Sequence, residues 1–173
     1  MSFCIFAMLK PIKSTFMEGR FAVVYVSDKN DYDDLRFLFL EYEKDLGFNL
    51  SFQDFNRELD ELKSMYAYPE GAAYIIRKNN TAVGCIAVRK LENNIAEIKR
   101  MFVRKKVRGK GYGKLLLDCA LIACHELGYA RVRLDTIDYM KPAIKAYKSA
   151  GFYEIPAYRH NPFNNAVFME KVL

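Results

Sequence analysis

The stretch EIKRMFVRKKVRGKGYGK, from Glu97 to Lys114, decides how the rest of the chain is interpreted. Its first seven residues are typical of a β-strand. Three glycines, Gly109, Gly111 and Gly113, then lie in a basic loop directly before an amphipathic helix. Glycines let backbone amides crowd around an anion, and the first amides of a helix have no intrahelical partner. The stretch therefore predicts a phosphate-binding loop at a helix N-terminus.

Two well-known kinds of phosphate-binding loop fit this spacing poorly. A Walker A loop needs GxxxxGK followed by Ser or Thr, whereas Lys114 is followed by Leu115. A dinucleotide-binding fingerprint needs GxGxxG, whereas Gly109, Gly111 and Gly113 are spaced as GxGxG.

A third kind of loop matches closely. Arg108, Gly111 and Gly113 fit the pattern (Gln or Arg)xxGx(Gly or Ala), which resembles the acetyl-CoA loop of the GNAT superfamily of N-acetyltransferases. The resemblance covers nearly the whole chain from Phe21. Its other segments are EIKRMFV (97–103), RVRLDT (131–136) and AIKAYKSAGF (143–152). The segment LFLEYEKDLGFNLSFQDFNREL (38–59) also resembles one bacterial branch of that superfamily.

The resemblance implies both a fold class and a co-substrate. The fold is a single α/β (α+β) domain with a mixed, mostly antiparallel seven-stranded sheet, splayed between strands 4 and 5 and flanked by about four helices. The co-substrate is acetyl-CoA, whose pantetheine arm pairs with the strand-4 backbone while loop amides hold its pyrophosphate. The residues predicted to bind it are Met101, Phe102, Val103, Arg108, Gly109, Lys110, Gly111, Tyr112, Gly113, Lys114, Met140 and Tyr147.

Hydrophobic periodicity predicts the remaining elements. Strands are expected over 21–26, 73–77, 81–91, 96–103, 131–137, 152–158 and 166–173, and helices over 31–46, 52–66, 111–127 and 142–151. Asp31 and Ser51 are the expected caps of the first two helices. We expect residues 21–173 to be the N-acetyltransferase domain. Residues 1–20 are an expected extension whose order the sequence leaves open, with Met17 as an alternative start.

Acetyl transfer to an amine needs a neutral nucleophile, a stabilised oxyanion and a proton for the departing thiolate. Glu97 is the predicted base, acting through water; the alternative is a strand residue that is exposed at the surface or held in a salt bridge, for example with Lys99. Tyr147 resembles the tyrosine that sits beside the CoA sulfur in relatives and protonates it; the alternative is a core aromatic. The amide of Met101 is expected to meet the oxyanion. Met140 replaces an Asn of many relatives and is expected to pack against the cofactor.

Several other residues are weaker candidates for the site. His125 has no second ligand spaced for a metal, so no metal site is predicted. The loop residues His160 and Asn161 border the substrate in relatives, as do residues around the first helix. The latter are Glu41, Tyr42, Glu43 and Phe48, although an ordinary amphipathic helix would give the same pattern.

Charge and cysteine usage narrow the function further. The net charge is +6, and the window from Lys99 to Lys114 holds eight cations and no acid. The four cysteines form no CxxC pair and indicate a reducing cytoplasm.

The predicted function is acetyl transfer from acetyl-CoA to a primary amine of a small molecule or peptide, in a ternary complex. The alternatives are a catalytically silent acyl-CoA sensor and a nucleic-acid-binding module on the 99–114 strip. We expect no nucleic-acid or membrane partner, and a monomer or homodimer.

Overall fold

A computed structural model of the protein describes residues 21–173, so the predicted extension over 1–20 lies outside the described residues. The strands are β1 (Phe21–Tyr25), β2 (Ala72–Lys78), β3 (Thr81–Glu92), β4 (Ile95–Val103), β5 (Arg131–Ile137), β6 (Tyr153–Ile155) and β7 (Ala166–Val172). The helices are α1 (Lys29–Leu46), α2 (Phe55–Asp60), α3 (Leu62–Tyr66), α4 (Tyr112–Glu126) and α5 (Lys141–Ser149), with 3-10 turns η1 (Ser51–Gln53) and η2 (Lys105–Val107).

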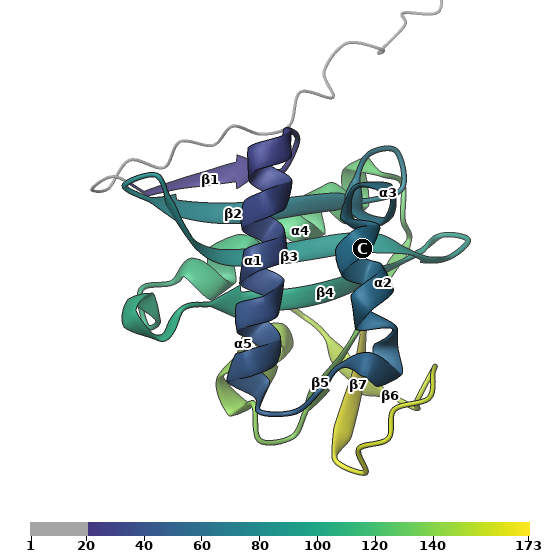
Figure 1. Ribbon diagram of the computed structural model, residues 1–173. Helices are drawn as coiled ribbons and strands as arrows, with labels where there is room; N and C mark the ends of the chain where they lie inside the picture. The colour runs from purple at the N-terminus through teal and green to yellow at the C-terminus, as the bar shows by residue number, and fades with distance from the viewer. Residues whose placement is uncertain (1–20) are drawn as a thin grey trace, which may run out of the picture.

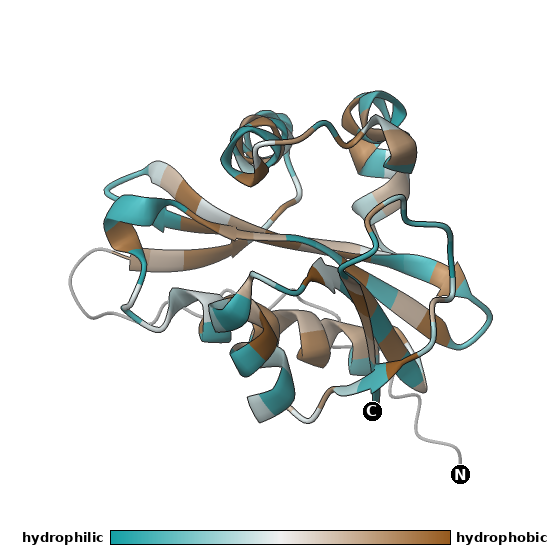
Figure 2. Cartoon of the chain, turned by 90° about the horizontal axis from the view of Figure 1, so that it is seen from below, coloured by the Kyte–Doolittle hydropathy of each residue, from teal (hydrophilic) through white to brown (hydrophobic). Residues whose placement is uncertain are grey.

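The strands form one seven-stranded sheet in the order β1-β2-β3-β4-β5-β7-β6. Helices α1, α2 and α3 cover one face, and α4 and α5 cover the other, as Figures 1 and 2 show. Each face has its own apolar core, for example Ile98 and Leu116 on the α4 side and Leu35 and Phe39 on the α1 side. No helix within residues 21–173 is long and apolar enough to cross a membrane.

The sheet opens between β4 and β5, its one parallel pair. The two strands have nine and seven residues, yet they pair at only three positions, from Ile95 with Arg131 to Glu97 with Arg133. Beyond these residues the strands diverge, which leaves facing stretches of backbone without their usual sheet partner. The predicted single α/β domain, splayed between strands 4 and 5, is therefore confirmed.

The helices differ in detail from the prediction. The expected helix over 52–66 is split into η1, α2 and α3, because Asp54 has φ of 57° and Glu61 has φ of −110°, neither of which continues a helix. Ser51 therefore begins a 3-10 turn and caps no α-helix. Helix α1 begins at Lys29, two residues before the predicted cap Asp31. Asp28 is the cap instead, because its carboxylate accepts a hydrogen bond from the amide of Asp31 at 2.9 Å.

A β-bulge in β4 controls which side chains reach each face. Arg100 has φ of 55°, and the register with β3 shifts between Cys85 and Ala87. The extra residue interrupts the usual alternation of side chains. Lys99 and Arg100 both hydrogen-bond to Gln53 on the α2 side, whereas Met101 packs into the core under α4. Two adjacent cations thus lie on the same face of a buried strand.

Candidate active site

The loop between β4 and α4 has the features of an anion site. Gly109 and Gly111 have φ of 78° and 81°, in the left-handed region that glycine adopts without strain. Within residues 21–173, the amides from Gly109 to Lys114 have no backbone acceptor, and the first bond of α4 runs from the amide of Leu115 to Gly111. This group of amides at a helix N-terminus can accept an anion, as the sequence predicts.

Most cations of the 99–114 window have acidic partners in the folded protein, although the window itself contains no acid. Five of the eight lie within 4.0 Å of a carboxylate from another part of the fold or the next turn: Arg100 with Glu58, Arg104 with Glu41, Lys105 and Arg108 with Asp45, and Lys114 with Asp118. In residues 21–173, the other three (Lys99, Lys106 and Lys110) have no such partner. The exposed loop therefore keeps two free ammonium groups, at 106 and 110, beside its open amides.

The side chain of Arg108, a predicted cofactor residue, faces back toward the protein. Its guanidinium donates to the carbonyl of Val103 at 2.7 Å and to the carboxylate of Asp45 at 2.7 Å. These contacts tie the loop to the end of β4 and to the end of α1. Its backbone amide donates to the carbonyl of Lys105 at 3.3 Å, so the open amides of the loop begin at Gly109.

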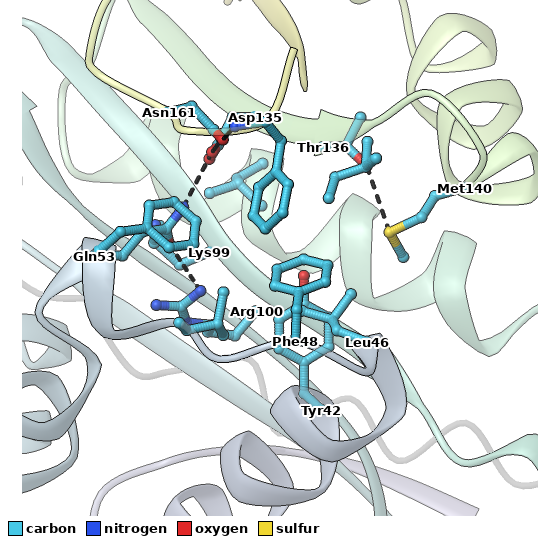
Figure 3. Close-up of a pocket in the computed structure, with 15 residues that line it drawn as sticks. Tyr42, Leu46, Phe48, Gln53, Lys99, Arg100, Asp135, Thr136, Met140 and Asn161 are labelled. Atoms are coloured by element: carbon cyan, nitrogen blue, oxygen red, sulfur yellow. Dashed lines mark hydrogen bonds between the residues drawn. The ribbon is translucent and has the colours of Figure 1, made fainter. Parts of the chain in front are cut away.

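A cavity of about 40 Å³ lies where β4 and β5 diverge (Figure 3). Its walls come from both strands, from the end of α1 with the loop that follows, and from the loop between β6 and β7. The lining residues are Tyr42, Leu46, Phe48, Leu50, Phe52, Gln53, Ile98, Lys99, Arg100, Asp135, Thr136, Ile137, Met140, Asn161 and Phe163. The ring of Phe163, in the β6–β7 loop, packs against Phe48 and Phe52, in the segment after α1. The centroid distances are 4.4 Å and 5.5 Å.

Lys99 is a buried cation on the wall of this cavity. Its side chain is 4% exposed, and its Nζ donates to the Oε1 atom of Gln53 at 2.9 Å. Burial lowers the pKa of Lys99 from 10.5 to about 7; the nearby Arg100 lowers it as well, while Glu97 opposes the shift. Near pH 7 the amine is therefore divided between its charged and neutral forms.

Gln53 connects the charged groups around the cavity. Its Oε1 accepts from both Lys99 and Arg100, and its Nε2 donates to Asp135 at 3.1 Å. Asp135 also accepts from Asn161 at 3.1 Å and from Arg159. A single amide thus links β4, β5 and the turn η1 over the splay.

Glu97, the predicted base, is fully buried and ion-paired. Its carboxylate accepts from Arg89 at 2.8 Å, from Tyr158 at 2.9 Å and from Arg159 at 3.0 Å, and it has 0% exposure. Burial favours the neutral acid, but Lys99, Arg159 and Arg89 outweigh it and lower the pKa to about 2. The salt-bridge alternative thus describes this residue, with two arginines as direct partners. A carboxylate held this way is a poor proton acceptor at neutral pH.

Tyr147, the predicted acid, lies on α5 and is 6% exposed. The centroid of its ring lies 5.8 Å from that of Phe152, and its hydroxyl has no hydrogen-bond partner within residues 21–173. Burial raises its pKa, as do Tyr42 and Asp135 more weakly. It does not line the cavity, whereas Met140, at the start of the same helix, does and accepts from the Thr136 hydroxyl at 3.7 Å.

The weaker candidates separate into two groups. Tyr42, Phe48 and Asn161 line the cavity. Glu41 pairs with Arg104, and Glu43 accepts the amide of Leu50 at 2.8 Å, so both carboxylates support the fold. His125 is exposed on α4, and His160 lines a separate, shallow hollow.

Sequence reasoning missed the polar centre of the cavity. Gln53, Lys99, Arg100 and Asp135 line it, although none was a predicted site residue. The available signal was the KR pair inside the buried strand EIKRMFV, because charged residues on a buried strand need partners or a function. The RLDT segment places Asp135 on the facing strand in the same way.

Comparison with known proteins agrees with this geometry. Residues 29–152 match the family model for the acetyltransferase (GNAT) family, so the chain belongs to that family. An uncharacterized N-acetyltransferase of Schizosaccharomyces pombe is 38% identical over 141 residues, which cover 80% of this chain and 86% of the relative. Because this relative is from a yeast, the expected bacterial branch is not confirmed.

Solved structures share the fold. An acetyltransferase from Streptococcus agalactiae has a TM-score of 0.73 at 21% identity, over 91% of this chain and all of that one. An acetyltransferase structure from Bacillus anthracis, solved in complex with acetyl coenzyme A, has a TM-score of 0.54 at 24% identity, over 64% of this chain and 68% of that one.

Proposed function

We propose that the protein transfers the acetyl group of acetyl-CoA to a primary amine of a small molecule or peptide, by direct attack in a ternary complex. The observation that carries the proposal is the gap between β4 and β5, which has open loop amides at one end and a polar cavity between its walls. A donor in the gap and an acceptor in the cavity can thus meet at β4. The acetyl-CoA complex of the Bacillus anthracis acetyltransferase supports the choice of donor.

Backbone groups hold the donor in this proposal. The pantetheine amides pair with the edge of β4 near Met101 and Val103, which lacks a β5 partner there. The pyrophosphate accepts hydrogen bonds from the open amides between Gly109 and Lys114. Phe102, Tyr112 and Met140 contact the cofactor through their apolar parts.

The chemical step needs an oxyanion donor and an acid. The amide of Met101 donates to the oxyanion that forms when the amine attacks the thioester carbon. Tyr147 gives its proton to the sulfur as the C–S bond breaks, so that no free thiolate has to form in a site with little water. Its raised pKa keeps the hydroxyl protonated until that moment. Glu97, with a pKa of about 2, serves in this scheme to hold Arg89 and Arg159 in place.

The test combines binding and turnover. We expect saturable calorimetric binding of acetyl-CoA in the micromolar range, and amine-dependent release of CoA with at least one of four probes: an amino acid, a polyamine, an aminoglycoside and a lysine-containing peptide. Tyr147→Phe is expected to lower kcat by about 10²-fold or more while binding is retained. Tyr139→Phe, an exposed tyrosine, serves as the control. Absence of heat with millimolar acetyl-CoA would refute the proposal; binding without amine acetylation would indicate a silent sensor.

A further inference from the structure

The proposed function leaves one step without a residue: the removal of a proton from the acceptor. An alkyl amine has a pKa near 10.4 and is mostly an ammonium ion at pH 7, and an ammonium nitrogen has no lone pair for attack. A base inside the site must therefore reach the acceptor nitrogen, directly or through one water. The described part of the chain offers few groups that can do this.

Most titratable groups at the cavity are unsuited to accept a proton at neutral pH. Burial raises the pKa of Tyr42 to about 12, so its hydroxyl stays protonated. The Glu97 carboxylate does not line the cavity, and it has a pKa of about 2 and three ionic or hydrogen-bonding partners. Asp135 accepts from three donors, on Gln53, Asn161 and Arg159. Neither His125 nor His160 lines the cavity.

We propose that the ε-amine of Lys99, in its neutral form, accepts the proton of the acceptor ammonium, and that Lys99 is thus a catalytic residue of this site. The inference rests on the proposed function. Lys99 lines the cavity between the diverging strands, two residues before the Met101 amide assigned to the oxyanion. Its Nζ hydrogen-bonds to Gln53 alone among residues 21–173 and has no carboxylate within 4.0 Å. The lone pair of the neutral amine is therefore available to a ligand in the cavity.

The charges around Lys99 explain why its neutral form is accessible near pH 7. Burial is the largest cause of the lowered pKa, and the cations Arg100 and Arg159 add to it, while Glu97 and Asp135 oppose it. The charged and titratable groups near Lys99 are Glu97 and Arg100 on β4, Asp135 on β5, Arg159 beyond β6, Glu58 on α2 and Tyr42 on α1. Glu58 accepts two hydrogen bonds from Arg100, so its negative charge is paired with that arginine and not with Lys99.

Protons and electrons balance in this scheme. Lys99 takes one proton from the ammonium, and the freed lone pair forms the C–N bond while the carbonyl π pair moves to oxygen. That pair returns as the C–S bond breaks, and the thiolate takes the proton of Tyr147. Tyr147 regains a proton from the former amine nitrogen through water, and Lys99 releases its proton to solvent after the products leave. Without a ligand the 40 Å³ cavity has room for about three waters, and those that the acceptor does not displace carry these protons.

The test uses two substitutions with opposite charge properties. Lys99→Arg keeps the cation but cannot lose its proton, because the arginine pKa exceeds about 12. Lys99→Met removes the amine and keeps an unbranched chain. With the wild type's best acceptor from the four-probe panel, both variants are expected to lose at least about 10²-fold in kcat. Calorimetric acetyl-CoA binding should remain, and exposed Lys63→Met should behave as wild type.

Two further readouts separate the outcomes. In the wild type, kcat/KM should fall as the pH drops below 7, because Lys99 becomes protonated. The pH profiles of both Lys99 variants should lack this acidic limb. By NMR with ¹³Cε-labelled lysine, the signal missing from Lys99→Met should titrate near pH 7; a titration near 10 would overturn the inference. If Lys99→Arg keeps wild-type kcat and only Lys99→Met raises KM, the side chain anchors an anionic group of the acceptor, and the proposal is wrong. If wild type binds acetyl-CoA but acetylates no amine, the proposed function fails instead.

Discussion

The loop after β4 and the buried face of β4 are neighbours in sequence but are built in opposite ways. The loop is exposed, and its function depends on glycine conformations and open amides between Gly109 and Lys114. The buried face holds Lys99 and Arg100 through partners such as Gln53 and Glu58, more than 40 residues away. The anion-binding features of the loop therefore come from one short segment of backbone. The arrangement of the buried face depends on contacts between segments that are far apart in the sequence. Substitutions in the two regions should separate binding from stability and catalysis.

The largest expected effect is on the stability of the buried face. Arg100→Met leaves the buried carboxylate of Glu58 without its cation, which should lower the free energy of unfolding by about 3–5 kcal/mol. Urea unfolding followed by circular dichroism measures the loss. Arg57→Met, which removes exposed ion pairs with Glu61 and Asp54, should lower the free energy of unfolding far less, because solvent screens these charges. Equal losses in both variants would show that the buried Glu58–Arg100 pair contributes no more to the free energy of unfolding than an exposed ion pair does.

A smaller effect concerns the pH dependence of stability. Lys99 has a folded pKa of about 7 and an ordinary value of 10.5, so between these pH values the unfolded chain binds more protons. Its contribution to the free energy of unfolding therefore rises with pH, by about 2 kcal/mol between pH 7 and 9. Lys99→Met should lack this rise and be more stable than wild type at pH 7. Urea unfolding at pH 7, 8 and 9 tests the difference, with Lys63→Met as control; parallel curves for wild type and Lys99→Met would contradict it.

The smallest expected effect on stability belongs to the loop. Gly111 and Gly128 both have φ of 81° and no atom within 4 Å of an added Cβ, so Ala at either position should cost about 1 kcal/mol. Gly111 lies among the open amides, whereas Gly128 follows the far end of α4. Gly111→Ala should therefore weaken acetyl-CoA binding by about tenfold or more in calorimetry, and Gly128→Ala should not. Equal affinities for the two variants would exclude the loop as the phosphate site.

The comparison also explains what the sequence could predict. The strands and the loop could be predicted because strand periodicity and glycine spacing are local signals, and the motif lies in one continuous stretch, 97–114. The splay of the sheet was implied only by the resemblance to the GNAT superfamily. The split of the expected helix 52–66 was missed because it depends on the left-handed conformation of Asp54, a residue that tolerates helix and turn alike. Strand alternation also fails at Arg100, where the bulge turns two consecutive cations to one face.

The roles of the charged residues were the hardest to predict. A glutamate on a strand facing the gap is a reasonable base from sequence, but its pKa depends on Arg89, Tyr158 and Arg159, which come from other strands and loops. Likewise, the eight cations in the 99–114 window suggested one free positive patch, although Glu41, Asp45 and Glu58 neutralise much of it. Such partners are set by the tertiary fold, and no spacing rule identifies them.

Direct transfer requires that the gap between β4 and β5 bring a thioester and an amine together. Its most direct test is a single-turnover reaction of enzyme, acetyl-CoA and the best amine of the panel, quenched and analysed by mass spectrometry. We expect one acetylated amine for each CoA released, no acetylated enzyme, and neither product when the amine is omitted. Release of CoA without acetylated amine, or accumulation of an acetylated enzyme, would contradict it.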